Sequence, residues 1–200
     1  MQVRWIASGS TYANSFVYGN ILVDAGVLPM TVEPYAEAIE TIVITHAHYD
    51  HTAHVKEIAR LCGDAAVCIH EADAPGLVDD ARSLSMHFGA RSPGITPDVV
   101  LHDADRIGDL LVIHTPGHTP GGICLYDAGA RMLFSGDTVF TEGSFGRYDF
   151  PGGDRTVLAA SIERLSALDV EGLYPGHGEP VLHDGGRHIA AAREALRYYG

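Results

Sequence analysis

Three histidines and one aspartate fall within six consecutive positions of this sequence. They are His46, His48, Asp50 and His51, and they follow an apolar run, Thr41 to Ile44, that is typical of a buried strand. Imidazole nitrogen and carboxylate oxygen are ligands that zinc, iron and manganese accept. Because His46 and His48 are two positions apart, their side chains can point to the same side of an extended turn and share one cation. The sequence therefore predicts a metal site that begins at this turn.

Three more ligand-type side chains lie downstream, each in a loop that follows a predicted strand. They are His118, Asp137 and His177, and each has a glycine directly before it, which allows the backbone to turn sharply. Any one of them alone would be more typical of a solvated loop residue, and Asp50 alone would equally suit the N-cap of a helix. Together with the histidine turn, they indicate four strand-to-loop junctions that deliver ligands to one site.

Composition and charge exclude several classes of protein. The 200 residues are 46% hydrophobic and contain no long polar linker, which predicts a single domain over residues 1–200. The formal charge of −13 disfavours binding to nucleic acid or to anionic membranes. There is no signal-peptide pattern and no apolar run near the roughly 18 residues of a membrane span. The three cysteines lack metal-type spacing and predict buried free thiols, so we expect a cytoplasmic protein.

The order of predicted strands and helices favours two sheets over one. Short strands are expected first, at 3–7, 15–18 and 21–24, and strands and helices then alternate from residue 41. Two sheets packed face to face, with helices on their outer faces, would bury the apolar runs and gather the loops at one edge. The further strands are expected at 41–45, 66–69, 99–102, 110–114, 122–126, 132–135 and 172–174, and the helices at 71–78, 156–168, 186–198 and in a segment ending near 61.

The order of the candidate ligands resembles the signature of the metallo-β-lactamase superfamily. That signature is a His-x-His-x-Asp-His turn followed by a single His, an Asp and a final His, and this sequence has all of them in that order. The resemblance covers nearly the whole chain. It implies an αββα sandwich of two packed mixed β-sheets with helices on the outer faces, in agreement with the two-sheet prediction.

The resemblance also implies a role for each ligand. One metal ion would be held by His46, His48 and His118, and a second by Asp50, His51 and His177. Asp137 would bridge both ions, so that Asp50 and Asp137 are the expected catalytic carboxylates. We expect two divalent cations, zinc in the first place, with iron and manganese as alternatives because all three suit nitrogen and oxygen ligands. A hydroxide held between the ions would be the nucleophile.

The segment 143–154 resembles that of the short glyoxalase II-like thioester hydrolases. This likeness implies that Arg147 helps to bind the thiol carrier of the substrate, whereas Asp137, at a position where true β-lactamases usually have cysteine, points away from lactam hydrolysis. Only 23 residues follow His177, so we expect no C-terminal glutathione-binding helical domain. A small-molecule thioester, such as an acylated low-molecular-weight thiol, is the expected substrate, and the identity of its thiol carrier stays open.

Further residues are expected around the ligands. Three polar side chains could fix the tautomers of the ligand imidazoles, although a simple turn role suits the first nearly as well: Asp24, Thr45 and Thr138. Tyr49 and Tyr148 are expected to contact the substrate together with Arg147. The segment 83–97, which is broken by glycine and proline, could cover the cleft.

Two other functions remain open at this point. A persulfide dioxygenase of the same superfamily would use a single iron at the first metal position, so metal content separates it from the hydrolase. A non-hydrolytic metal-binding or electron-transfer module, as in the diiron flavoproteins, usually has Glu where His48 stands here. The sequence indicates neither the acyl group of the substrate nor the oligomeric state.

Overall fold

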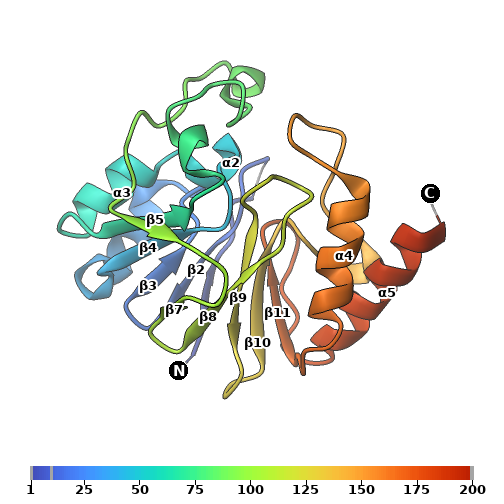
Figure 1. Ribbon diagram of the computed structural model, residues 1–200. Coiled ribbons are helices and arrows are strands. Elements are labelled where there is room, and N and C mark those ends of the chain that lie inside the picture. The colour runs from blue at the N-terminus through green and yellow to red at the C-terminus, as the bar shows by residue number, and fades with distance from the viewer. Residues whose placement is uncertain (1, 10, 199–200) are drawn as a thin grey trace. The chain divides into compact units, whose positions relative to one another are not determined.

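The computed structural model describes residues 2–9 and 11–198 (Figure 1). The chain divides into two compact units, Met1–Leu101 and His102–Gly200, called here the N-terminal unit and the C-terminal unit. Each unit contains one mixed β-sheet with helices beside it, so the prediction of an α/β fold with two mixed sheets is confirmed. That the whole chain is one domain stays a prediction.

The sheet of the N-terminal unit has six strands in sequence order. The first three pair antiparallel and the last three are added in parallel, which places the carboxyl ends of the third to sixth strands at one edge. The middle strands are buried on both faces, as their unbroken apolar sequences predict. The strands are β1 (Arg4–Ile6), β2 (Ser15–Tyr18), β3 (Ile21–Val23), β4 (Thr41–Ile44), β5 (Ala66–His70) and β6 (Val99–Leu101).

The helices of the N-terminal unit are short, and two predictions about them are wrong. The helix expected to end near 61 does end at Leu61, but it is divided into two helices, because His54 has non-helical backbone angles between them. The helix expected over 71–78 is a single 3₁₀ turn, since Pro75 and Gly76 do not continue a regular α-helix. The helices are α1 (Pro29–Val32), η1 (Glu33–Ala38), α2 (Tyr49–Thr52), α3 (Val55–Leu61), η2 (Ala74–Leu77) and η3 (Ser85–Phe88).

The sheet of the C-terminal unit has five strands in the order β11-β10-β9-β8-β7. Neighbouring strands are antiparallel except β10 and β11, which are parallel. Strands β8, β10 and β11 therefore run in the same direction, and their carboxyl ends lie at one edge of the sheet. The strands are β7 (Arg106–Ile107), β8 (Leu110–His114), β9 (Ile123–Asp127), β10 (Met132–Gly136) and β11 (Gly172–Pro175).

Two long helices cover this second sheet. They are α4 (Arg155–Leu165) and α5 (Gly185–Tyr198), which lie side by side in Figure 1, and a 3₁₀ turn, η4 (Thr141–Gly143), precedes them. Asp154 caps α4 by accepting a hydrogen bond from the backbone of Val157 at 3.0 Å. Apolar side chains at helical spacing, Leu158 and Ile162 among them, are buried between α4, α5 and the sheet.

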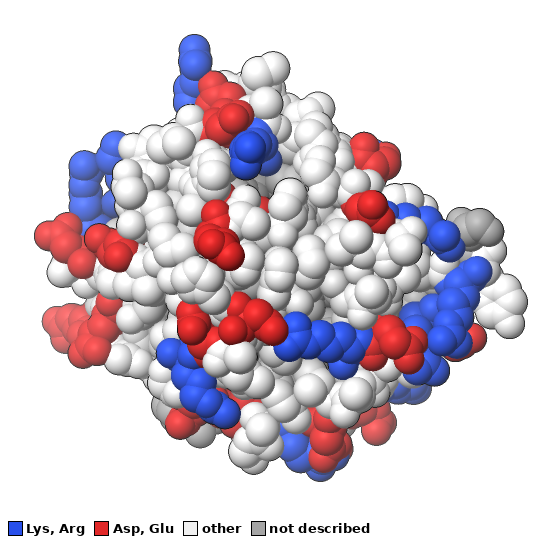
Figure 2. Space-filling view, viewed as in Figure 1, with Lys and Arg blue, Asp and Glu red and all other residues white. Residues whose placement is uncertain are grey.

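Three arginines of α4 and α5 are paired with acidic side chains. Arg164 binds Asp103 at 2.9 Å, and both Arg193 and Arg197 contact Glu163. In Figure 2, basic and acidic atoms alternate over these two helices. This face therefore presents no continuous basic surface of the kind that binds a phosphate backbone. None of the helices in the described part of the chain has the length and apolar character that a membrane crossing requires.

Candidate functional site

The histidine turn of the N-terminal unit follows β4 and continues into α2. The side chains of His46, His48 and His51 are buried, with at most 4% of each residue exposed. Nε2 of His46 lies 3.1 Å from Nδ1 of His48. Two nitrogen ligands on one tetrahedral zinc ion are about 3.3 Å apart, so this pair has a spacing that suits a single cation.

A second donor pair lies beside the first. Nε2 of His51 is 3.7 Å from Oδ2 of Asp50, and the ring of His51 lies 4.1 Å from the ring of His46 between centroids. The ligand atoms of His46 and His51 are within 4.8 Å of one another. The N-terminal unit thus holds two neighbouring pairs of metal-ligand atoms, which suits two ions better than one.

Asp24 determines which nitrogen His46 and His51 can offer to a metal ion. Its buried carboxylate accepts hydrogen bonds from the backbone nitrogen of Thr45 at 2.7 Å, from the Thr45 hydroxyl at 2.8 Å and from Nδ1 of His51 at 2.8 Å. The oxygen of that hydroxyl is 3.2 Å from Nδ1 of His46 and can accept its proton. Both imidazoles are then protonated at Nδ1, and the lone pair at Nε2 is available for a metal ion.

The backbone around the turn is held by contacts that the sequence does not reveal. A Cβ atom at Gly26 would lie 2.0 Å from the carbonyl oxygen of Asp50, so only glycine fits where this loop meets α2. Ala25 also donates a backbone hydrogen bond to the carbonyl of His51 at 2.8 Å. On another side, the carboxylate of Asp73 accepts from the backbone of Ala47 at 2.9 Å.

Tyr49, predicted to contact substrate, belongs to a group of three aromatic rings. Its centroid is 5.4 Å from that of Phe88 and 6.5 Å from that of Tyr12, and its backbone nitrogen donates to the carbonyl of Ser83 at 2.7 Å. All three rings are partly exposed. They form an apolar surface next to the histidine turn. Because Phe88 belongs to the segment 83–97, that segment contributes to this surface.

Asp80 holds the beginning of that segment in place. Its carboxylate accepts from the backbone of Ser92 at 2.8 Å and from the hydroxyl of Ser85 at 3.2 Å, and it pairs with Arg91 at 3.0 Å. These contacts, those with Ser92 first, lower the pKa of Asp80 below its usual value. An ionised Asp80 therefore orders the residues around Phe88.

The C-terminal unit gathers its three candidate ligands at the edge where β8, β10 and β11 end. His118 follows β8, Asp137 follows β10 and His177 follows β11. One oxygen of Asp137, Oδ2, lies 3.6 Å from Nε2 of His118 and 3.7 Å from Nε2 of His177. A carboxylate that stands at nearly the same distance from two imidazoles is suited to bridge two cations, each bound by one of them.

The loop that contains Arg147 is packed against two of these ligands. Nδ1 of His118 donates to the backbone carbonyl of Arg147 at 2.6 Å, which leaves Nε2 as the metal-binding nitrogen. A Cβ atom at Gly146 would lie 1.9 Å from the carbonyl oxygen of Asp137. The sequence predicts a role for the side chain of Arg147. The contact with His118 is instead made by the backbone carbonyl of Arg147, which any residue at this position would have, so the sequence could not indicate it.

The side chain of Arg147 is engaged within its own loop. Its Nε and Nη2 atoms donate to the two carboxylate oxygens of Asp149 at 2.9 and 2.7 Å, and its guanidinium lies 4.2 Å from the centre of the Phe150 ring. Hydrogen bonding to Arg147 lowers the pKa of Asp149. Tyr148, the other residue predicted to contact substrate in this loop, stacks on Phe145 with ring centroids 6.5 Å apart.

Several predicted residues are less directly connected to the ligands. The hydroxyl of Thr138 lies 2.9 Å from that of Thr115, so its role in orienting an imidazole stays a prediction. His188, which is not a candidate ligand, accepts a hydrogen bond from the backbone of Glu142 at 2.9 Å. The three cysteines are buried and free, and burial raises the pKa of Cys68 and of Cys124 to about 11. Neither thiol is suited to act as a nucleophile at neutral pH.

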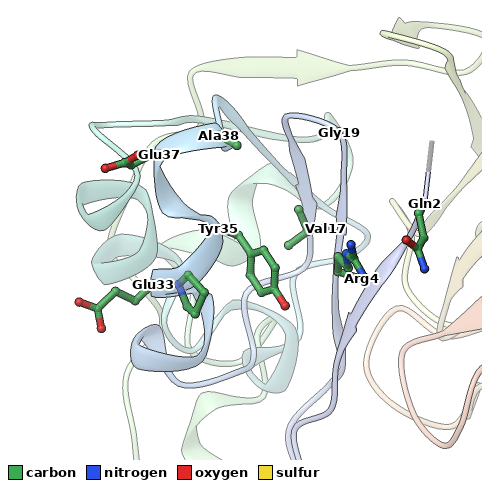
Figure 3. A pocket seen from close by; sticks show the side chains of 9 residues that line it. Gln2, Arg4, Val17, Gly19, Glu33, Tyr35, Glu37 and Ala38 are labelled. Carbon is green, nitrogen blue, oxygen red and sulfur yellow. The ribbon is translucent and has the colours of Figure 1, made fainter.

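A surface pocket of about 710 Å³ in the N-terminal unit is lined by residues of β1, β2 and η1 (Figure 3). In this view the ring of Tyr35 points toward Val17 and Arg4, while the carboxylate of Glu33 points to the opposite side. None of the predicted ligands lines it. The pocket is therefore separate from the histidine turn.

Comparison with known sequences gives a consistent set of relatives. A sequence profile described as "Metallo-beta-lactamase superfamily" matches residues 9–177. A probable metallo-hydrolase of Methanocaldococcus jannaschii is 33% identical over 70% of this chain and 70% of its own length. An acyl-coenzyme A thioesterase of Bos taurus is 34% identical over 68% of this chain and 54% of its own. A hydroxyacylglutathione hydrolase of Rhodospirillum rubrum is 33% identical over 74% and 55%, so this chain matches only about half of the last two.

Solved structures show the same likeness in three dimensions. A protein crystallised in a di-iron-bound form has a TM-score of 0.76 and 31% identity, with 92% of each chain covered. The B3 metallo-beta-lactamase BLEG-1 has a TM-score of 0.82 and 28% identity, with 98% of this chain and 99% of the other covered.

Proposed function

Because this chain belongs to the metallo-beta-lactamase superfamily, we propose that it is a metal-dependent hydrolase of small thioesters. The observation that carries the proposal is the position of Asp137, whose one oxygen stands at nearly equal distances from His118 and His177. The N-terminal unit supplies two further pairs of metal-ligand atoms, one from His46 and His48 and one from Asp50 and His51, so that each ion would receive one pair. Relatives named as an acyl-coenzyme A thioesterase and a hydroxyacylglutathione hydrolase favour the thioester as the bond that is cleaved.

In this proposal the chain would hold two divalent cations. One set consists of His46, His48 and His118, and the other of Asp50, His51 and His177, with Asp137 shared between them. The donor set fits such ions, because hydrogen bonds at Nδ1 of His46, His51 and His118 leave Nε2 as the donor atom. Zinc, iron and manganese all accept this combination of ligands.

Two such cations lower the pKa of a water molecule and polarise a carbonyl group. The chain itself supplies orientation: Asp24 and Thr45 hold the imidazoles of one unit, and the carbonyl of Arg147 holds His118 in the other. The rings of Tyr12, Tyr49 and Phe88 offer an apolar surface for the acyl group. No side chain is assigned as a general acid, because a thiolate is a good leaving group.

The test joins metal content to turnover. We expect purified protein to contain two divalent ions per chain by elemental analysis, to release thiol from acetyl thioesters, and to lose this activity on chelation. Asp137→Ala should lower metal content and abolish nearly all turnover, because both ions lose a ligand. Full activity of Asp137→Ala, or of exhaustively chelated protein, would contradict the proposal.

The same preparation distinguishes the other candidates. Lactam hydrolysis is a second candidate, since the likeness to a B3 metallo-beta-lactamase extends over nearly all of both chains. Turnover of a chromogenic cephalosporin with no thioester hydrolysis would establish it. One iron per chain together with oxygen consumption on a persulfide would instead indicate the dioxygenase.

A further inference from the structure

The loop beside His118 and Asp137 contains Arg147, whose positive charge is neutralised by Asp149. A hollow of about 340 Å³ is lined by Phe145, Gly146, Arg147, Tyr148 and Asp149, all from this loop. The guanidinium of Arg147 donates two hydrogen bonds to the carboxylate of Asp149. Both side chains are more than half exposed, at 63% and 58%, so the pair faces solvent and any molecule bound in the hollow.

We propose that the Arg147–Asp149 pair makes this loop select thioesters whose thiol carrier is uncharged near the sulfur. The inference rests on the proposed thioester hydrolase function and specifies its substrate class. An arginine has five N–H donors, and Asp149 occupies two of them, so three remain for a neutral acceptor such as an amide carbonyl. A carboxylate on the carrier would gain little from the neutral pair and would be repelled by Asp149.

The geometry keeps the pair in this state. The face of Phe150 lies 4.2 Å from the guanidinium carbon, which holds the plane of Arg147 in the orientation that meets both oxygens of Asp149. The backbone of the loop is fixed to the ligand loops through the hydrogen bond from His118 and the close approach of Gly146 to Asp137. The hollow therefore lies next to the residues that would hold the metal ions.

The test uses two substrates that differ by one charge. They are the S-acetyl derivatives of N-acetylcysteinamide, which is neutral, and of N-acetylcysteine, which carries a carboxylate at neutral pH. We expect metal-loaded wild-type protein to have the higher kcat/KM for the amide. Asp149→Asn should lower the ratio of kcat/KM for the amide to kcat/KM for the acid by about fivefold, which corresponds to the upper range for an exposed ion pair.

A matched control accounts for the change in net charge. Asp169→Asn removes one carboxylate from a comparable exposed pair, that of Asp169 with Arg131, elsewhere in the same unit. It should leave the ratio of amide to acid within about twofold. Calorimetry with the S-ethyl thioethers of the same two carriers should show the same shift in dissociation constants without turnover.

Three results would overturn the inference while leaving thioester hydrolysis intact. They are a wild-type preference for the acid, an unchanged ratio in Asp149→Asn, and an equal change in Asp169→Asn. If neither thioester is hydrolysed by the metal-loaded wild type, the proposed function itself fails, and the two failures are thereby distinguished.

Discussion

Replacing Asp24 by asparagine should weaken metal binding through the orientation of an imidazole. The residue has a left-handed backbone with φ of 59°, a conformation that asparagine tolerates, so the change is confined to the side chain. An amide has one acceptor oxygen where the carboxylate uses both oxygens for three hydrogen bonds. The remaining amide oxygen would keep the hydrogen bond from the backbone nitrogen of Thr45, because that N–H can only donate. The NH₂ group would then replace the oxygen that contacts both the Thr45 hydroxyl and Nδ1 of His51, and the proton of His51 would move to Nε2.

The size of the effect follows from these contacts. Loss of a partner that orients a ligand costs about 10- to 100-fold in metal affinity. The buried polar groups left without an acceptor should lower the free energy of unfolding by about 1–3 kcal/mol. We expect competition with a chelator to show the first effect, and denaturant unfolding of the metal-free protein to show the second.

Asp73→Asn is the matched control. Its carboxylate is also buried and accepts a backbone hydrogen bond from the histidine turn, at Ala47. It should reduce stability by a similar amount and metal affinity by much less, because the hydrogen bond from Ala47 comes from the backbone and not from a ligand imidazole. If both variants lost metal affinity equally, or if Asp24→Asn kept the wild-type affinity, fixation of the tautomer by Asp24 would be the wrong explanation.

Two further predictions concern the segment that contributes Phe88. Phe88→Ala should raise KM about two- to tenfold for thioesters with an aromatic acyl group and change KM for the acetyl thioester little, whereas Met86→Ala, in the same segment with a 70% exposed side chain, should change neither. Equal effects on both substrates would argue against an acyl-binding surface. Because the pKa of Asp80 is lowered in the folded protein, the ordering it provides is present above pH 3.8 and is lost as the pH falls through the lower, folded value. Asp80→Ala should therefore raise hydrogen exchange of residues 83–92 at neutral pH, and the wild type should show that increase only in acid; unchanged exchange in the variant would contradict this role.

The strands of the fold were predictable where apolar runs are long. The strand at 110–114 has the predicted bounds, and α5 begins within one residue of its expected start. Helices α1 and η1 were not predicted, since both are short and each has proline near its start. The two-residue strand β7 was also missed, because it depends on pairing with β8 rather than on its own sequence.

The candidate ligands were recognisable because residue type and spacing carry the chemistry. The groups that hold them were harder to predict where they act through the backbone, as the carbonyl of Arg147 and the close approach of Gly26 do. Such contacts depend on which loops meet in space, and any residue has a carbonyl group. Asp24 was identifiable as a candidate because its carboxylate is the interacting group.

The three strands β8, β10 and β11 have a consequence for how this protein can change during evolution. Asp137 comes one residue after its strand and His177 two residues after its own, so their positions are set mainly by the rigid sheet. The stretches that continue beyond them can lengthen, shorten or alter in sequence without moving these donors. New substrates can thus be acquired by remodelling loops such as 143–154 while the ability to bind metal is inherited unchanged.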